Sequence, residues 1–222
     1  MNTMSVVISA PIGIFGGTFD PIHVGHLRTG YELMHALQLT EVRWIPVGNP
    51  GHRDPPLASA SLRLEMVRVA IAGQPGFVLD DREIRRSGVS RTIDTLCELR
   101  EEYPGRSISV LLGMDAFAGF MHWHRWPEIF DYAHLVVAHR PGWPPPTEGP
   151  LAALLTERAM PDVRALHSSP CGGIHVRKVT PLEVSSTDLR ELLVAGDDPR
   201  FLVPDPVRAI IVESGCYARA HE

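Results

Sequence analysis

The stretch G-G-T-F-D-P-I-H-V-G-H, at 16–26, combines residue types that suit an anion-binding site. Gly16 and Gly17 allow a ligand to approach the backbone closely, and Pro21 stiffens the loop. His23 and His26 are three positions apart, so they should lie about one turn apart on one face of a helix that begins near His23. The N-terminus of such a helix has unpaired N–H groups and a positive dipole end. The stretch therefore predicts an anion pocket with two imidazole donors and no obvious nucleophile.

Each part of this stretch also has an ordinary structural explanation. Paired glycines commonly form a turn, Asp20-Pro21 is a common start of a turn, and a single helical histidine is usually a surface or core residue. All of these features at one predicted strand–helix junction favour a ligand site. The histidines could also bind a metal ion, but no third ligand stands at a suitable spacing. The phosphate-binding patterns GxGxxG and GxxxxGK[ST] do not occur.

The predicted elements place the stretch at the end of the first strand. Apolar runs and helical periodicity alternate along the chain. Strands are expected at Ile12–Phe15, Val42–Val47, Phe77–Leu79, Ile108–Leu112, Leu135–His139 and Ile174–Val179. Helices are expected at His23–Leu37, Ser61–Ala72, Thr92–Glu102, Ser186–Ala195 and Asp205–Ser214. This order predicts an α/β fold with a doubly wound, mostly parallel sheet, which binds ligands at the carboxyl ends of its strands.

Two segments lie between the predicted elements. Asp80–Ser90 is polar, and Arg140–Pro150 contains five prolines, so we expect the latter to be a surface excursion or a boundary and not an element. In the first helix, residues at helical spacing are expected to face the core. They are Leu27, Tyr31, Met34 and Leu37.

The composition is that of an ordinary globular protein, with 222 residues, of which 44% are hydrophobic and 21% charged. We expect one domain over 1–222, with a C-terminal helical part over about 186–222. A net charge of −5 gives no reason to expect a nucleic-acid or membrane partner. Three scattered cysteines, Cys97, Cys171 and Cys216, predict reduced thiols and a cytoplasmic protein. No run approaches the roughly 20 apolar residues of a membrane span.

Two motifs resemble those of the nucleotidylyltransferase superfamily. The stretch at 16–26 is similar to the HxGH signature, which binds the triphosphate of ATP or CTP. V-S-S-T-D-L-R, at 184–190, is similar to the ISSTxxR motif of the adenylyltransferase branch, with Val184 in place of Ile. Ser185 and Asp188 could also form a helix-capping box, which is compatible with phosphate binding at the same helix N-terminus. The resemblance implies a Rossmann-like nucleotidylyltransferase fold.

Three stretches between these motifs resemble the nicotinate-nucleotide adenylyltransferase branch. They are S-R-T-I-D-T-L at 90–96, L-L-G-M-D-A-F at 111–117 and H-W-H-R-W at 122–126, with R-P-G at 140–142 closing the next strand. The resemblance, over about 12–195, implies that ATP and nicotinate mononucleotide give nicotinate adenine dinucleotide and pyrophosphate, in NAD biosynthesis. The alternatives are a sister enzyme for nicotinamide mononucleotide or phosphopantetheine, and a non-catalytic nucleotide sensor. An aminoacyl-tRNA synthetase fragment is disfavoured, because a KMSKS-like motif is missing.

The resemblance assigns the ATP phosphates to His23, His26, Ser186, Thr187 and Arg190. Of these, His23, His26 and Arg190 are the predicted catalytic residues, and His26 is preferred for stabilising transition-state charge. The other predicted ATP contacts are Gly16, Gly17, Thr18, Phe19, Gly113 and Asp115. Mg²⁺ should accompany the triphosphate through phosphate and water oxygens, and no protein ligand of the metal is predicted.

Asp115 follows a predicted strand, so its carboxylate is expected to bind the ATP ribose. Its alternative is to cap a helical turn that begins near Ala116. On the acceptor side the resemblance implies that Trp123 stacks on the nicotinate ring, although it could also be an ordinary core or surface tryptophan. Backbone N–H groups of Thr92 and His124 should bind the nicotinate carboxylate, and Arg53 should lie near the phosphates or on the surface. The expected partners are thus two small molecules, ATP and nicotinate mononucleotide, and the oligomeric state stays open.

Overall fold

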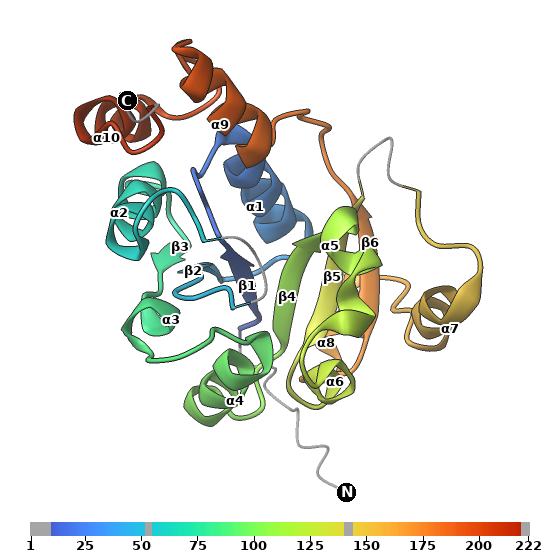
Figure 1. The fold of residues 1–222 in the computed structure, drawn as a ribbon. Coiled ribbons are helices and arrows are strands. Elements are labelled where there is room, and N and C mark those ends of the chain that lie inside the picture. The colour runs from blue at the N-terminus through green and yellow to red at the C-terminus, as the bar shows by residue number, and fades with distance from the viewer. Residues whose placement is uncertain (1–9, 52–54, 140–143, 219–222) are drawn as a thin grey trace, which may run out of the picture.

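Six strands form one parallel sheet in the computed structural model, which describes residues 10–51, 55–139 and 144–218 (Figure 1). The spatial order of the strands is β3-β2-β1-β4-β5-β6. Their bounds are β1 Ile12–Gly17, β2 Glu41–Pro46, β3 Phe77–Leu79, β4 Ile108–Gly113, β5 His134–His139 and β6 Ile174–Lys178. The predicted fold class and all six predicted strands are confirmed, with shifts of one or two residues at six of the twelve strand ends.

Helices cover both faces of the sheet. The longer ones are α1 Val24–Ala36, α2 Ala60–Ala70, α4 Thr92–Glu102, α7 Gly149–Glu157, α9 Ser186–Ala195 and α10 Asp205–Ser214. The short ones are α3 Arg82–Arg85, α5 Met114–Ala118, α6 Ile129–Tyr132 and α8 Val163–His167, with 3₁₀ turns η1 Phe120–His122 and η2 Trp126–Glu128. One apolar cluster joins the sheet to α1, α2, α9 and α10, and another joins it to α4, α5 and α6. Side chains alternate between them along the strands, as Leu111 and Leu112 do.

Five of these helices were not predicted from the sequence. They are α3, α5, α6, α7 and α8, and four of them have only four or five residues, too few to show a helical period. The polar segment Asp80–Ser90, for which no helix or strand was predicted, contains α3. The end of the proline-rich segment is also helical, because Pro150 occupies the first turn of α7, where a missing N–H costs nothing. Residues 140–143 lie outside the described residues.

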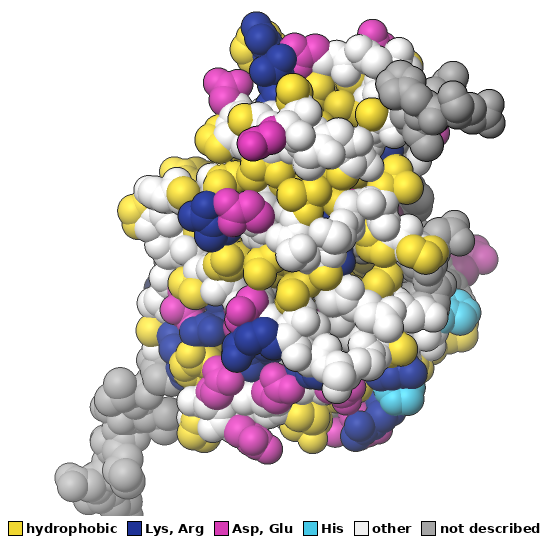
Figure 2. All heavy atoms as spheres, turned by 60° about the vertical axis from the view of Figure 1, so that its left-hand side comes forward, with side chains coloured by type: hydrophobic (Ala, Val, Ile, Leu, Met, Phe, Trp, Pro, Cys, Tyr) yellow, Lys and Arg dark blue, Asp and Glu magenta, His cyan; other side chains and the backbone are white. Residues whose placement is uncertain are grey.

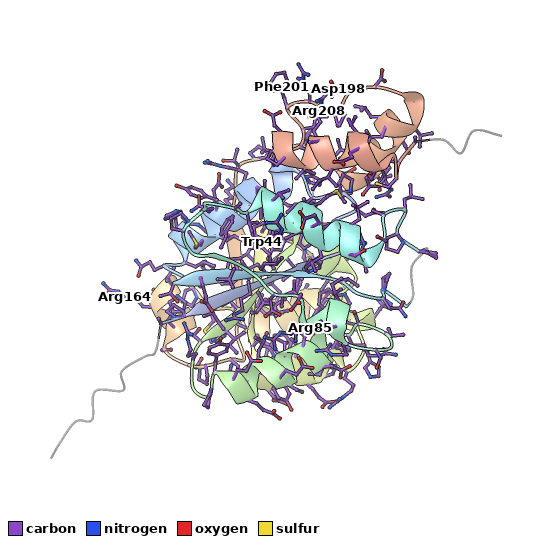
Figure 3. All side chains as sticks on the ribbon, turned by 90° about the vertical axis from the view of Figure 1, so that its left-hand side faces the viewer. Trp44, Arg85, Arg164, Asp198, Phe201 and Arg208 are labelled. Carbon is purple, nitrogen blue, oxygen red and sulfur yellow. The ribbon has the colours of Figure 1, made fainter. Side chains whose placement is uncertain are left out.

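The first helix buries most of the predicted stripe, with one exception. Met34 and Leu37 are buried and Leu27 packs against the same apolar cluster, whereas Tyr31 is exposed. The helix also buries Gly25, Thr29, Gly30 and Leu33. A Cβ atom on Gly30 would lie 2.6 Å from the ring of Trp44, a residue of β2 that lies inside the molecule (Figure 3). The small residue therefore allows α1 to approach β2 closely.

The surface over α3 and α4 is densely charged. Figure 2 shows arginine and acidic side chains side by side over the lower part of that face. Arg82 pairs with Asp80, Glu98 and Glu102, and the Arg82–Asp80 contact is 2.8 Å long. Such pairs bind α3 to α4 and to the end of β3.

Cys97, Cys171 and Cys216 are free thiols. Within the ranges that the structure describes, no helix has both the length and the apolar character needed to cross a membrane.

Candidate active site

The strand order changes direction at β1, and there the sheet opens. β1 pairs with β2 as far as Gly17 with Pro46, and β4 pairs with β5 as far as Gly113 with Ala138. The β1–β4 pairing ends earlier, at Ile14 with Val110, so these strands separate toward their carboxyl ends. Parallel α/β sheets bind ligands at such a switch point. The two predicted motif glycines of β1 and Gly113 of β4 therefore lie on opposite sides of the opening.

The histidine pair lies directly after β1, at the start of α1. The helix begins at Val24, and His23 is its N-cap with extended backbone rather than a helical residue. Nδ1 of His23 accepts from the backbone N–H of His26 at 3.4 Å, and Nδ1 of His26 accepts from that of His23 at 3.3 Å. The two rings stack with centroids 3.7 Å apart. The prediction that the rings lie together is confirmed, but a reciprocal capping box brings them together instead of two helical positions.

This capping box also determines the tautomer of a neutral ring at either position. Because both Nδ1 atoms accept backbone hydrogen bonds, a neutral ring at either position carries its proton on Nε2. The ring of Phe19 meets His26 edge-on, with centroids 5.2 Å apart, and Phe15 and Trp44 pack behind it. The imidazole of His26 is thus held by a backbone N–H, a stacked ring and an aromatic edge.

The motif at 184–190 lies against the motif at 16–26, although the two are far apart in sequence. Ser185 caps α9 by accepting from the N–H of Asp188 at 3.1 Å, which is one half of the capping box considered above. The hydroxyl of Ser186 donates to the carbonyl of Pro21 at 3.0 Å, and Arg190 donates to the carbonyl of Asp20 at 2.9 Å. A second Arg190 nitrogen donates to the hydroxyl of Thr187 at 3.2 Å. The structure therefore brings both predicted phosphate motifs together.

A buried network behind the motifs was missed by sequence reasoning. Asp20 accepts hydrogen bonds from the backbone N–H groups of Leu57 and Ala58, at 2.9 and 3.1 Å, and from the hydroxyl of Tyr217 at 2.7 Å. Burial and the Asp20 carboxylate raise the pKa of Tyr217. The hydroxyl therefore remains protonated and fastens the residues after α10 to the loop. Asp20 was read only as the start of a turn, because its partners are far away in sequence.

Arg63 is the second residue that the sequence reasoning missed. It is 1% exposed, and it donates to the carbonyls of Ala58, Thr18 and Gly48 at 3.3, 2.7 and 3.3 Å. Burial lowers the pKa of this guanidinium, while Asp20 raises it. Arg63 thus ties the loop after β1 to the loop after β2. Its position three residues before Met66 on a core-facing stripe was a signal that could have identified it.

The carboxyl end of β4 carries the predicted ribose contacts. Gly113 is the N-cap of α5, and Asp115 is an exposed residue in the first turn, so the expectation that Asp115 caps a turn starting near Ala116 is wrong. A Cβ atom on Gly113 would lie 2.3 Å from Oδ1 of Asp115. The glycine therefore leaves room for the carboxylate to fold back toward the end of the strand, beside the opening between β1 and β4.

The predicted acceptor residues lie on the α4 side of the sheet. Thr92 is the first residue of α4, and the N-cap Arg91 makes no side-chain capping bond there. Ile93 and Trp123 belong to the same apolar cluster, in which Trp123 packs on Phe120 with centroids 5.5 Å apart. His124 follows on the exposed surface. Arg53 lies outside the described residues, so its position is not tested.

The described residues offer no ready-made metal site. No group of three or more His, Cys, Asp or Glu side chains among them is arranged to bind a metal ion. The nearest carboxylate to the histidines in sequence is Asp20, whose oxygens accept three protein hydrogen bonds. These residues therefore do not fit a resident metal ion held mainly by protein ligands.

Comparison with known proteins agrees with this geometry. Residues 14–192 match the model of the cytidylyltransferase-like family. The chain is 48% identical to the probable nicotinate-nucleotide adenylyltransferase of Aeromonas hydrophila, over 96% of this chain and all of that protein. It is 46% identical to the protein of the same name from Dechloromonas aromatica, over 95% of this chain and 99% of that one.

A solved structure shares the fold at lower identity. The Plasmodium falciparum nicotinic acid mononucleotide adenylyltransferase, solved in complex with NaAD, superimposes with a TM-score of 0.71 at 17% identity. The match covers 94% of this chain and 97% of that one. At this identity the likeness concerns the fold, and the two bacterial relatives carry the family assignment. The chain accordingly belongs to the nicotinate-nucleotide adenylyltransferases, a branch of the cytidylyltransferase-like family.

Proposed function

We propose that this chain transfers the adenylyl group of ATP to nicotinate mononucleotide, giving nicotinate adenine dinucleotide and pyrophosphate. A phosphate oxygen of the mononucleotide attacks the α-phosphorus of ATP and forms a new P–O bond. The bond from the α-phosphorus to the bridging oxygen breaks, and its electron pair leaves with pyrophosphate. No covalent enzyme intermediate is needed, so the protein has to hold two anionic substrates in line and stabilise their charge.

The observation that carries the proposal is the stacked histidine pair at the opening between β1 and β4. Since each Nδ1 accepts a backbone N–H, each Nε2 is the donor nitrogen of a neutral ring. Rings held in this way need no reorganisation when charge develops on the transferring phosphate. We assign to His26 the stabilisation of that charge and to His23 the binding of neighbouring phosphate oxygens. Gly16, Gly17, Thr18 and Phe19 are assigned to the base of the phosphate-binding site.

The start of α9 supplies the second set of donors. The hydroxyls of Ser186 and Thr187 already bond to Pro21 and Arg190. We therefore assign the β- and γ-phosphates to the first N–H groups of α9, which lack partners within the helix, and to Arg190. Mg²⁺ enters as part of the ATP substrate, bound chiefly by phosphate and water oxygens. Asp115 and Gly113 are assigned to the ATP ribose.

The proposed acceptor, nicotinate mononucleotide, has a planar ring that carries a carboxylate. Stacking on Trp123 supplies on the order of 0.5–1.5 kcal/mol beyond area burial. Stacking does not distinguish an acid from an amide, so selectivity is assigned to the N–H groups of Thr92 and His124, with Arg53 toward the phosphate. An amide would place its NH₂ against donors arranged for two oxygens. We further propose that the chain is one domain over 1–222 and acts in the cytoplasm.

The test compares nicotinate and nicotinamide mononucleotides, each with ATP and Mg²⁺, by pyrophosphate release. We expect kcat/KM to favour the nicotinate form by at least about 10²-fold, because a mismatched amide leaves a donor without an acceptor. Trp123→Ala should raise KM for nicotinate mononucleotide far more than KM for ATP. Trp126→Ala is the matched control, because Trp126 packs on the same Phe120 ring. Equal use of both mononucleotides would exclude the proposed acceptor but not adenylyl transfer itself.

A further inference from the structure

Glu83 of α3 is a buried carboxylate that the adenylyl-transfer scheme does not use. The residue is 7% exposed. The hydroxyl of Thr95 donates to its Oε1 at 2.7 Å, and the hydroxyl of Ser90 faces the same carboxylate. Burial raises the pKa of Glu83, and these two hydroxyls and the charge of Arg86 lower it. A polar group so deeply buried is destabilising unless it is hydrogen-bonded. The carboxylate therefore needs the two hydroxyls, and it also holds both of them in position.

Ser90 extends this contact to the loop after β2. Its Oγ accepts from the N–H groups of Gly48 and Asn49, at 3.1 and 3.3 Å, and its own N–H donates to the carbonyl of Asn49 at 2.8 Å. A Cβ atom on Gly48 would lie 2.1 Å from the carbonyl oxygen of Glu83. The backbone of the loop therefore touches α3, and one carboxylate holds the loop after β2 and the segment before α4 together.

Thr92 lies between the two residues that Glu83 holds. Ser90 precedes it by two positions and Thr95 follows it by three. Arg91 provides no side-chain cap; its carbonyl accepts from the N–H groups of Asp94 and Thr95, at 3.1 and 3.3 Å, and not from that of Thr92. Ile93 is fully buried beneath them. The direction of the Thr92 N–H thus depends on the two anchors on either side of it.

We infer that Glu83 is a positioning residue for the acceptor substrate, which sets the start of α4 and the loop after β2 in the arrangement that binds nicotinate mononucleotide. The inference rests on the proposed function. Among the described residues, Glu83 makes no hydrogen bond to α1, α9 or the Asp20 network, which form the proposed ATP side, and it reaches that side only indirectly, through Gly48 and Arg63. Its loss should therefore weaken binding of the acceptor much more than binding of ATP.

The experiment measures KM for each substrate, kcat and the thermal midpoint of three variants. Glu83→Ala and Ser90→Ala should each raise KM for nicotinate mononucleotide by about tenfold, the size expected for a lost hydrogen bond to a charged group. KM for ATP and kcat at saturation should change less than about twofold. Glu83→Gln should lie between wild type and Glu83→Ala, because its NH₂ would meet a Ser90 oxygen that already accepts two N–H groups.

Two controls separate positioning from general stability. Glu102→Ala removes a carboxylate at the far end of α4 that pairs with Arg82, so it should leave both KM values unchanged. Because Glu83 and Ser90 act through one network, the double variant Glu83→Ala/Ser90→Ala should raise KM little more than either single change. If Glu83→Ala does not fold, Ser90→Ala and Glu83→Gln carry the test.

The outcomes separate this inference from the proposed function. A wild-type protein that does not turn over nicotinate mononucleotide would exclude the proposed function before any variant is measured. If the wild type is active, equal changes in KM for ATP and for the mononucleotide would overturn the role of Glu83, and so would unchanged KM values or additive single changes. Quenching of tryptophan fluorescence by nicotinate mononucleotide alone should show the same order of affinities without turnover.

Discussion

Histidines at the two ends of the sheet differ in what their nitrogens do. At the carboxyl end, His23 and His26 each use Nδ1 to accept a backbone N–H and stack on one another. At the amino end, Nδ1 of His134 accepts from Gly173 and Nε2 donates to the carbonyl of Ser169, both at 3.0 Å. His167 is similar, since Nε2 donates to the carbonyl of Leu37 at 2.7 Å and Nδ1 lies 3.2 Å from the Ser107 hydroxyl.

The difference shows that one kind of side chain can either join distant loops or present an oriented ring at the proposed site. Both ring nitrogens of His134 and His167 bond to the protein and so join loops that are distant in sequence. In the N-terminal pair, the backbone sets the tautomer through Nδ1, and the site lies where β1 and β4 separate. Burial accordingly lowers the pKa of His134 from 6.5 to about 4, since its surroundings disfavour a charged ring.

His26→Ala should give the largest effect. We expect kcat to fall by about 10²-fold or more with an unchanged thermal midpoint, because the variant loses a transition-state donor. Steady-state kinetics and circular dichroism on the same preparation provide the check. A folded variant with wild-type turnover would remove His26 from the chemistry.

Arg190→Ala tests a residue that joins distant segments and is also assigned to the ATP phosphates. Two of its nitrogens bond to Asp20 and Thr187, yet its charge faces the start of α9. We expect KM for ATP to rise by about tenfold to a hundredfold, as for a lost charge-assisted hydrogen bond. Arg164→Ala, an exposed arginine on α8 (Figure 3), is the control and should leave KM unchanged. Identical kinetics for both variants would contradict the assignment.

His134→Ala should show the opposite pattern. The N–H of Gly173 would be left buried without its acceptor, so the free energy of unfolding should fall by about 1–3 kcal/mol. Values of kcat and KM should stay at the wild-type level. Urea unfolding with parallel kinetics measures both, and His35→Ala, an exposed histidine on α1, is the stability control. A large loss of activity without a loss of stability would contradict the assignment of His134 to folding.

The acid dependence of stability tests the charge of the His134 ring, with no effect expected near neutral pH. The folded-state pKa of His134 lies below its unfolded value, so the unfolded chain binds the extra proton between pH 6.5 and about 4. Its stabilisation is therefore complete above pH 6.5 and is lost as the pH falls, by about 1.4 kcal/mol per pH unit. His134→Asn, which cannot titrate, should have a shallower acid slope by that amount in urea unfolding at pH 7.5, 6 and 5. Equal slopes in the two proteins would exclude His134 as the source.

The alternation of apolar runs and helical periods determined the sheet and five of the six longer helices, all but α7. Each of the six predicted strands is present, because a buried parallel strand is a short apolar run bounded by turn residues. The motifs at 16–26 and 184–190 determined the family and the residues to which roles are assigned. Local sequence could do this because the residues of each motif are neighbours in the chain.

Contacts between distant segments were decided by the tertiary structure alone. Two examples are the hydrogen-bonded pairs Asp20–Tyr217 and Arg63–Gly48. In each pair, nothing in the sequence around one residue indicates the other as its partner. The close approach of α1 to β2 depended on the space that Gly30 leaves for Trp44, and Tyr31 is exposed where helical spacing placed it in the core. Periodicity reports only what one element would bury by itself. Which partner it meets depends on packing and hydrogen bonding among groups that come together when the whole chain folds.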